Sequence, residues 1–436
     1  MPRLNSFIRT APLFCFMMLA ALMVHDNFGL HGNPEPNNRL HVVFNPYEQV
    51  DWNSFSQHKA ALHVHTLQSD GYHMLSDVVH AYRDAGFTIL AITDHDWNYP
   101  NARVGWGHVP EEEASPYPAD PKPDHFPANT TWPWTDYGGP DPDDLGIVGI
   151  EAAELTFRHH INSYFTDYGV WYERTGSEAP YGGIVDEEGN EIWEDDQLYD
   201  IRESGGLAIL DHPGLSQSHG FWDRKPLEWY AERFGKHSAG YLIGLEVTNT
   251  DRTAELRQRE IYDEALWDQL LARFMPHRPI FGFGTDDMHR LDDVRDSHTI
   301  FLLDELNETT VREAMEAGQF IFTKSDIRLN FFEDEMSRFP VVSRIKVDHE
   351  KGTITIDASG YDTITWISAP ESLEPLEDYK TSDQPWPMGT VVHEGETIHY
   401  RDVSGIQNYL RAEIIREENG ERYRTFTNPF GLSSGQ

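Results

Sequence analysis

The sequence places histidine and carboxylate side chains at or just beyond the ends of short apolar runs. The first such motif is His63-x-His65, and Asp70 follows it within a predicted turn. Residues i and i+2 of a strand point to the same side, so both imidazoles can address one metal ion. A carboxylate in the turn beyond can bend back toward the same point. One His-x-His pair can be structural, so further motifs are needed to define a metal site.

The same arrangement recurs along the chain, where other apolar runs end or begin with ionisable residues. Burial of such groups without partners would cost several kcal/mol, so the pattern requires either metal ions or a hydrogen-bond network. Strand ends converge on one face of an α/β barrel, which would bring the motifs together. The recurring motifs are Thr93-Asp94-His95, Gly149-Ile150-Glu151, His160, Asp211-His212-Pro213-Gly214 and Asp286-Asp287-Met288-His289.

Imidazole and carboxylate ligands suit divalent cations, and a set this large suits two or three of them. Such ions generate a hydroxide nucleophile near neutral pH and stabilise both the attacked group and the leaving oxygen. The sequence therefore predicts hydrolysis of an ester bond in a small molecule. Asp94 or Asp211, each beside a histidine, could orient an imidazole ring, but either could equally act as a capping group.

Strands that alternate with helices would position these motifs. Continuous Ile, Leu and Val runs predict strands buried on both faces of a parallel sheet, and the alternation predicts an α/β barrel. The predicted strands are Ala61–Thr66, Thr88–Asp94, Gly146–Leu155, Ile161–Tyr168, Leu207–Asp211, Tyr241–Val247, Ile280–Gly284 and Thr299–Leu303. The predicted helices run from Ser76 to Gly86, over residues 261–274, and from a capping box at Thr310 and Glu313 to Gly318.

Two insertions interrupt this alternation, and a different pattern follows it. The proline-rich segment 96–144 predicts a lid or substrate wall, with an ornamental insertion as the alternative, and residues 170–196 predict a hairpin. Short strands separated by turns predict a small β-sandwich over residues 327–436. Its predicted strands are Ile327–Phe332, Arg344–Val347, Thr353–Ala358, Thr363–Ser368, Thr397–Arg401, Asn408–Arg416 and Arg422–Thr427.

The N-terminus predicts export. Residues 1–24 combine Arg3 and Arg9 with an apolar run too short to span a bilayer comfortably, which is typical of a signal peptide, and an uncleaved anchor is the alternative. A polar spacer is expected over residues 25–57, and no later segment is apolar enough to cross a membrane. The only cysteine, Cys15, lies in the signal. We therefore expect a secreted or periplasmic protein without disulfides, whose metal ligands are nitrogen and oxygen atoms.

The charge of the chain argues against a polyanionic partner. The 436 residues include 73 acidic and 34 basic ones, for a formal net charge of −39, and the excess is spread along the sequence. Such a surface repels phosphate backbones, so nucleic acid is not expected as a partner. Hydrophobic residues make up 39% of the chain, enough for a substantial core and unlike a disordered composition.

In their order and composition, the motifs resemble those of the polymerase and histidinol phosphatase (PHP) superfamily of metallohydrolases, over residues 58–290. The resemblance implies a distorted (β/α)7 barrel, residues 58–326, ahead of the β-sandwich, and up to three Zn, Mn or Fe ions with Glu151 bridging two of them. It implies as ligands His63, His65, Asp70, His95, Glu151, His160, His212, Asp287 and His289. Asp286 could replace Asp287, Glu154 could compete with Glu151, and His159 with His160.

A narrower resemblance concerns the later part of the chain. Ala314-Met315-Glu316-Ala317-Gly318, Arg411-Ala412-Glu413 and Thr427-Asn428-Pro429 resemble a branch of PHP metallohydrolases related to carbaryl esterase.

The expected activity is that of a phosphoesterase on small phosphate esters, with Glu151, His212 and Asp287 as catalytic residues. The alternatives are a carboxylic-ester or amide hydrolase at the same ions and a secreted binding protein without turnover. A phosphomonoester would favour a nearby cation, and Arg158, Arg224 and Arg290 lie beside or near candidate ligands in the sequence. The sequence does not define the oligomeric state.

Overall fold

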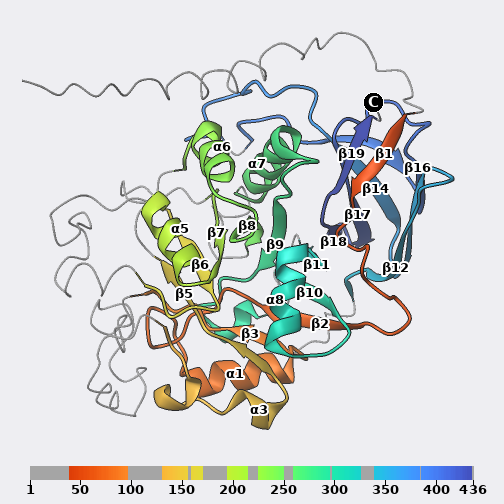
Figure 1. Ribbon diagram of the computed structural model, residues 1–436. Helices are drawn as coiled ribbons and strands as arrows, with labels where there is room; N and C mark the ends of the chain where they lie inside the picture. Colours follow the sequence, from red (N-terminus) through yellow and green to blue (C-terminus); the bar gives the residue numbers. More distant parts are fainter. Residues whose placement is uncertain are drawn as a thin grey trace, which may run out of the picture. The chain divides into compact units, whose positions relative to one another are not determined.

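The computed structural model describes most of the chain beyond the N-terminal segment (Figure 1). The described residues lie within one compact unit that spans residues 36–436. The predicted signal peptide, residues 97–129 of the first insertion and residues 170–193 of the predicted hairpin fall outside them. None of the helices that could be described is long and apolar enough to cross a bilayer. The described ranges are 39–96, 130–155, 159–169, 194–214, 224–249, 259–294, 297–325, 338–382 and 384–434.

The described strands form three sheets. The largest has the order β1-β19-β17-β18-β11-β10-β2-β3-β4, with β14 paired to both β15 and β17. Its strands are β1 (Leu40–Phe44), β2 (Ser56–Ala61), β3 (Ile89–Ala91), β4 (Val148–Ile150), β10 (Ser297–Leu303), β11 (Phe320–Ser325), β14 (Thr363–Ser368), β15 (Thr390–Glu394), β17 (Tyr409–Glu418), β18 (Glu421–Thr427) and β19 (Phe430–Ser434).

The second sheet has the order β5-β6-β7-β8-β9, and the third β12-β13-β16. The second consists of β5 (Ala152–Leu155), β6 (Ile161–Tyr164), β7 (Leu207–Leu210), β8 (Leu242–Asn249) and β9 (Phe281–Thr285). The third consists of β12 (Val341–Asp348), β13 (Thr353–Ser359) and β16 (Thr397–His399). Isolated bridges pair Val64 with Met288 and His95 with Glu154, so the first two sheets meet at their strand ends.

The mixed α/β class is confirmed, but a closed (β/α)7 barrel is not found among the described residues. Strands β2, β3 and β4 are parallel, as are β7, β8 and β9. The expectation of an all-parallel sheet is wrong at two strands, because β6 runs antiparallel to β5 and β7, and β10 runs antiparallel to β2 and β11. Buried apolar runs indicate strands covered on both faces and do not define direction.

Helices pack on both of the two larger sheets, and their apolar faces follow the helical period. In α1, Leu75, Val78, Val79 and Tyr82 are buried at spacings of three and four residues. Helix α8 ends as predicted at Gly318, which has a φ of +72°, but its capping box joins Asn307 and Thr310 instead of Thr310 and Glu313. The described helices are α1 (Leu75–Asp84), α3 (Pro142–Leu145), α5 (Glu194–Glu203), α6 (Leu227–Lys236), α7 (Arg259–Phe274) and α8 (Glu308–Ala317), with 3-10 turns at Trp134–Tyr137 and Leu291–Asp293.

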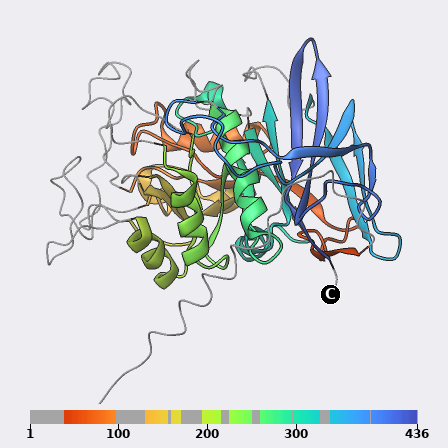
Figure 2. The same cartoon turned by 90° about the horizontal axis from the view of Figure 1, so that it is seen from above.

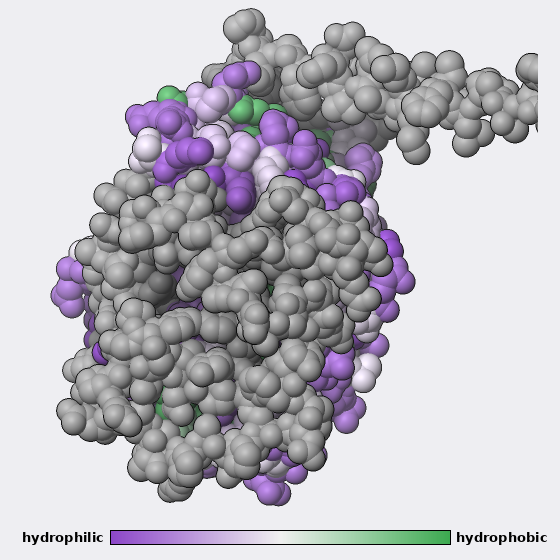
Figure 3. Space-filling model, turned by 90° about the vertical axis from the view of Figure 1, so that its left-hand side faces the viewer, coloured by the Kyte–Doolittle hydropathy of each residue, from purple (hydrophilic) through white to green (hydrophobic). Residues whose placement is uncertain are grey.

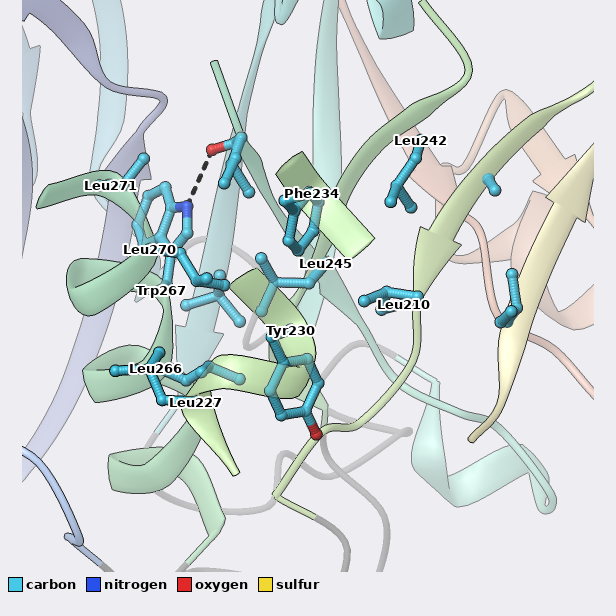
Figure 4. Close-up of a cluster of buried hydrophobic side chains, with 14 of the residues drawn as sticks. Leu210, Leu227, Tyr230, Phe234, Leu242, Leu245, Leu266, Trp267, Leu270 and Leu271 are labelled. Atoms are coloured by element: carbon cyan, nitrogen blue, oxygen red, sulfur yellow. Dashed lines mark hydrogen bonds between the residues drawn. The ribbon is translucent and has the colours of Figure 1, made fainter. Parts of the chain in front are cut away.

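A large apolar core lies between α6, α7 and the second sheet (Figure 4). Tyr230 and Phe234 of α6 and Trp267 of α7 are buried there against strand residues. The indole nitrogen of Trp267 donates to the carbonyl of Ile280 at 3.0 Å, so its single polar atom is satisfied. This packing fixes both helices behind the strand ends that carry the ionisable motifs.

Hydrogen bonding continues across the predicted domain boundary at residue 327. Strand β11, inside the predicted barrel range, pairs with β18 of the predicted sandwich, and β1, inside the predicted spacer, pairs with β19. A buried ion pair adds to this contact, because Arg411 of β17 binds both carboxylate oxygens of Asp268 on α7 at 2.8 Å. The predicted sandwich itself is not confirmed, since β17 and β18 belong to the same sheet as β2 and β3.

The described part of the surface is mainly hydrophilic where it is visible in Figure 3. This agrees with the acidic composition of the chain, in which 73 carboxylates outnumber 34 basic residues. Figure 2 shows the helices and sheets of the first two thirds of the chain beside the C-terminal strands.

Candidate metal centre

Four side chains from three separate motifs meet at one buried point. The Nε2 atoms of His63 and His65 lie 3.1 Å apart, and each lies 3.2 Å from Oδ1 of Asp287. Oε2 of Glu154 lies 3.3 Å from His63 Nε2 and 3.1 Å from His65 Nε2. Ligands about 2.0 Å from one tetrahedral ion would lie roughly 3.3 Å apart. The observed spacings of 3.1 to 3.3 Å are close to this value, so the four side chains could share one cation.

Glu154 lies at the centre of a wider cluster, because its two oxygens face different histidines. Oε2 also lies 3.1 Å from Nδ1 of His95. Oε1 lies 3.1 Å from Nε2 of His212 and forms a short contact with Nδ1 of His160. Glu154 is 1% exposed. A carboxylate with histidines on both oxygens can bridge two ions.

A further group of ligands lies beside His65. Oδ1 of Asp70 is 3.4 Å from His65 Nδ1 and 3.4 Å from His95 Nε2, and Oδ2 is 3.3 Å from His289 Nε2. The cluster therefore offers several adjoining ligand groups, among them His63, His65 and Glu154, then His65, Asp70 and His289, and Glu154, His160 and His212.

Strand direction explains how His160 joins ligands that follow other strands. His160 precedes β6, whereas Glu154 lies in β5 and His212 follows β7. Because β6 is antiparallel, its first residue, Ile161, pairs with the last residues of β5 and β7, Leu155 and Leu210. The start of β6 therefore lies at the same sheet edge as the ends of its neighbours. Asp211 continues this pairing, since its N–H donates to the carbonyl of His160 at 3.1 Å.

Two residues of the cluster have backbone angles that non-glycine residues rarely adopt. His212 has a φ of +24° and Asp287 a φ of +43°. Such conformations cost about 1–3 kcal/mol each and persist only where the surroundings hold them. Both residues follow buried strands and turn their side chains toward His63.

The electrostatics of the cluster favour charged groups in spite of burial. Burial alone would raise the pKa of Glu154, but His160, His63 and His95 hold it well below its usual range. Likewise, burial would lower the pKa of His95, but Asp70 and Glu154 raise it to about 9. Histidine and carboxylate stabilise each other's charge here, and the pKa of His63 is raised in the same way by Asp287, Glu246 and Glu154. A metal cation can replace the protons that His63 and His95 hold in its absence.

Glu246 of β8 fixes the orientation of His63 from the side opposite the ligand cluster. It was not predicted from the sequence. Its Oε1 accepts hydrogen bonds from Nδ1 of His63 and the hydroxyl of Thr285, both at 2.7 Å. Its Oε2 accepts from the backbone N–H of His212 at 2.7 Å and from Nδ2 of Asn249 at 2.9 Å. With the Nδ1 proton of His63 fixed on Glu246, the Nε2 lone pair faces the cluster. The sequence signal that could have identified it is a single carboxylate within the predicted apolar strand Tyr241–Val247.

Most of the predicted ligands converge, with two corrections. Glu151 lies outside the cluster, since its carboxylate accepts from Thr130 at 3.1 Å and is only half buried, so Glu154 replaces it as the candidate bridging ligand. Asp286 accepts from the hydroxyl of Tyr82 at 2.8 Å, whereas Asp287 faces the histidines. The residues that converge are His63, His65, Asp70, His95, Glu154, His160, His212, Asp287 and His289.

The neighbouring alternatives have other partners. His159 donates from Nδ1 to the carbonyl of His160 and meets the hydroxyl of Tyr230 at 3.1 Å, so it points away from the cluster. Asp94 accepts from the N–H and hydroxyl of Thr66 at 2.7 Å and therefore acts as a local cap beside His65. Asp211 is fully buried within reach of His63 and Glu246, and burial raises its pKa well above the usual value.

The three arginines considered for phosphate binding have different positions. Arg158 lies outside the described residues. Arg290 stacks over Tyr72 at 4.0 Å. Arg224 donates to backbone carbonyls, including that of Gly214 at 2.7 Å.

The donor set fits divalent metal ions. Two imidazole nitrogens 3.1 Å apart cannot direct lone pairs at each other without a proton or a cation between them, and carboxylates flank both. Cysteine is absent from the cluster, so the ligands are imidazole nitrogens and carboxylate oxygens, which suit Zn, Mn and Fe ions.

Comparisons with known proteins gave structural likenesses only. No family model matches the chain, and no curated protein sequence matches it. It is similar to a two-domain protein from Bacteroides vulgatus containing a predicted PHP-like metal-dependent phosphoesterase, with 15% identity, a TM-score of 0.41, and coverage of 92% of this chain and 99% of that one.

Two further solved structures show weaker likeness. One is PsfC from Pseudomonas syringae, with 15% identity, a TM-score of 0.32, and coverage of 59% of this chain and 87% of that one. The other is a lesion-specific endonuclease from Pyrococcus furiosus, with 12% identity, a TM-score of 0.34, and coverage of 60% and 56%. None of the names of these three structures refers to carbaryl esterase, so the narrower resemblance stays a prediction. These likenesses are too weak to define the function of the chain.

Proposed function

We propose that this chain is a metal-dependent hydrolase of the PHP type that cleaves small phosphate esters. The observation that carries the proposal is Glu154, a buried carboxylate with His63, His65 and His95 on one oxygen and His160 and His212 on the other. Such a residue can hold two divalent ions side by side, and paired ions are a common means of hydrolysing phosphate esters.

The chain would supply the geometry of the reaction. Bound Zn, Mn or Fe ions, two or three per chain, would lower the pKa of water and polarise the ester. Asp287, held in a strained backbone conformation, presents its carboxylate to the same point as both histidines of the first motif. Glu246 fixes the tautomer of His63. We further infer that the two sheets joined at the 95–154 bridge correspond to a distorted PHP-type barrel.

The expected substrate is small and reaches the site from an aqueous exterior. A net charge of −39 slows the approach of polyanions, so nucleic acid is not proposed as a substrate. Export rests on the N-terminal motif alone. Mass spectrometry of the protein from the periplasm or medium tests it, because cleavage near residue 24 would remove the apolar run, whereas a retained anchor would leave the full mass.

Two matched carboxylate variants test the metal-dependent reaction. Glu154→Gln should lose bound metal and reduce kcat/KM on p-nitrophenyl phosphate roughly 100-fold or more, because a neutral amide replaces the carboxylate whose two oxygens serve the two ligand groups. Glu151→Gln, three residues away and outside the cluster, should retain both. Metal content is measured by elemental analysis of protein loaded with Zn or Mn. His65→Ala should lose metal and activity as Glu154→Gln does.

The outcomes separate the proposal from its alternatives. Hydrolysis of p-nitrophenyl acetate but not of p-nitrophenyl phosphate would refute the phosphoesterase assignment and leave a carboxylic-ester hydrolase. Fewer than two tightly bound ions in the wild-type protein, or equal losses in both glutamate variants, would refute the bridging role of Glu154.

A further inference from the structure

The connection between β14 and β15 is much longer than their pairing requires. These strands are antiparallel neighbours, with Ser368 opposite Thr390, and about two to five residues suffice to join such a pair. Here residues 369–389 join them. Figures 1 and 2 show this blue trace leaving the C-terminal strands and passing over α7 toward α6. We call residues 369–382 and 384–389 the strap.

Helix α7 holds both ends of the strap. Nε2 of Gln269 donates to the carbonyls of Ser372 at 3.2 Å and Pro387 at 2.8 Å. The N–H of Gly389 donates to Oδ2 of Asp268 at 2.8 Å. A side chain at Gly389 would meet that same oxygen at 2.7 Å, so this close approach depends on glycine. The strap is thus fixed to the helix that packs behind the second sheet.

Near its C-terminal end, the strap packs into an aromatic and cationic stack. Trp386 is 3% exposed and packs against Tyr262 of α7, with ring centroids 5.2 Å apart. The guanidinium of Arg224 lies over the same tyrosine ring, 4.4 Å from its centroid. Arg224 is itself 6% exposed. Cation–π contacts strengthen as the cation loses water, so the stack holds Arg224 in one orientation.

Arg224 connects the strap to the loop that carries a candidate ligand. Its Nη1 donates to the carbonyl of Ser382 in the strap at 2.5 Å, and its Nε donates to the carbonyl of Gly214 at 2.7 Å. Gly214 lies two residues after His212, whose φ of +24° must be held by its surroundings. Glu246 restrains the N–H of His212, and Arg224 restrains the chain just beyond it.

We infer that the strap of the C-terminal region positions His212 at the metal centre, with Arg224 as the positioning residue that transmits the contact. The inference rests on the proposed function, because it concerns the geometry of the same ligand cluster. It gives the C-terminal region a role in the reaction that the ligand motifs of the first 290 residues do not reveal. It also assigns Arg224 to loop placement and not to phosphate binding.

The test compares two variants at opposite ends of the contact. Arg224→Met keeps an apolar side chain on Tyr262 and removes both donors, and Trp386→Leu loosens the strap without touching either carbonyl. Each should weaken Zn affinity about tenfold, the lower end of the range for groups that orient metal ligands, and should alter the visible absorption of the Co-substituted protein. The double variant should lose no more affinity than the stronger single variant, since both act through one contact.

Arg273→Met is the matched control. Arg273 lies on the same helix as Tyr262 and pairs with Glu228 of α6. Among the described residues it has no hydrogen bond or ion pair to the strap, so its removal should leave Zn affinity and the Co spectrum unchanged. Arg224→Lys, which keeps the charge, should recover part of the loss. Melting temperatures of the metal-free proteins identify a variant that fails to fold. If Arg224→Met is such a variant, the Zn affinity and Co spectrum of Trp386→Leu alone test the inference.

Two results would overturn the inference: an Arg224→Met protein that matches the control in affinity and spectrum, or losses from the two variants that add fully in the double variant. Because affinity and absorption are measured without substrate, they test the strap even if the wild-type protein hydrolyses no phosphate ester.

Discussion

Glu246→Gln is the sharpest test of the arrangement behind the metal ligands. The carboxylate is fully buried and accepts four hydrogen bonds, two on each oxygen. Glutamine has the same shape but replaces one acceptor oxygen with a donor NH₂ group. If the NH₂ faces His63, that ring must accept at Nδ1 and carry its proton on Nε2, where the metal should bind. If it faces the other way, it opposes the N–H of His212 and the amide of Asn249.

The expected loss of stability follows from the number of hydrogen bonds that Glu246→Gln removes. Either orientation removes two hydrogen bonds to a charged acceptor, each worth about 1.5–3 kcal/mol, and either changes the tautomer of His63 or leaves N–H donors facing one another in a buried site. We therefore expect the metal-free protein to lose about 3 kcal/mol or more of unfolding free energy. Metal affinity should fall roughly 10- to 100-fold, as found for groups that orient ligand histidines.

Urea unfolding of metal-free protein and competition with a chromophoric zinc chelator measure the two effects. Glu151→Gln again serves as the control, since its carboxylate is half buried and bonds only to a threonine hydroxyl among the described contacts. A Glu246→Gln protein that unfolds at the wild-type urea concentration and binds zinc with unchanged affinity would refute the orienting role.

Two further predictions concern protons and the buried ion pair. Asp70 and Glu154 outweigh burial and raise the pKa of His95 to about 9, so this imidazole stabilises the metal-free fold fully below its ordinary pKa of 6.5 and loses that contribution as pH rises through 9. Zinc must displace this proton, so calorimetry in buffers of different ionisation enthalpy should show proton release, and affinity should increase from pH 7 toward 9. Arg411→Met leaves the buried carboxylate of Asp268 uncompensated, which should cost about 3–5 kcal/mol in urea unfolding.

The sequence predicted much of the site because ligand chemistry is local. Most predicted strands of the first two sheets appear within a few residues of their expected ranges, and apolar runs that end in ionisable residues identified eight of the nine converging ligands. Which strands pair with each other was harder to predict from the sequence. Strands β11 and β18 pair although their residues lie about 100 positions apart, and no local pattern defines which strand is the neighbour. Strand β1 was missed for the same reason, since its partner β19 lies at the other end of the chain.

The choice between Glu151 and Glu154 shows what local pattern cannot decide. Both follow apolar residues, and a continuous strand over 146–155 would place them on opposite faces, since they are three residues apart. The structure breaks that strand at residue 151: β4 ends in the first sheet, and β5 begins in the second. Only the pairing of Glu154 with Asn162 and its bridge to His95 turn its carboxylate toward the histidines. The ligand is thus defined by where the chain changes sheets, a property of tertiary pairing.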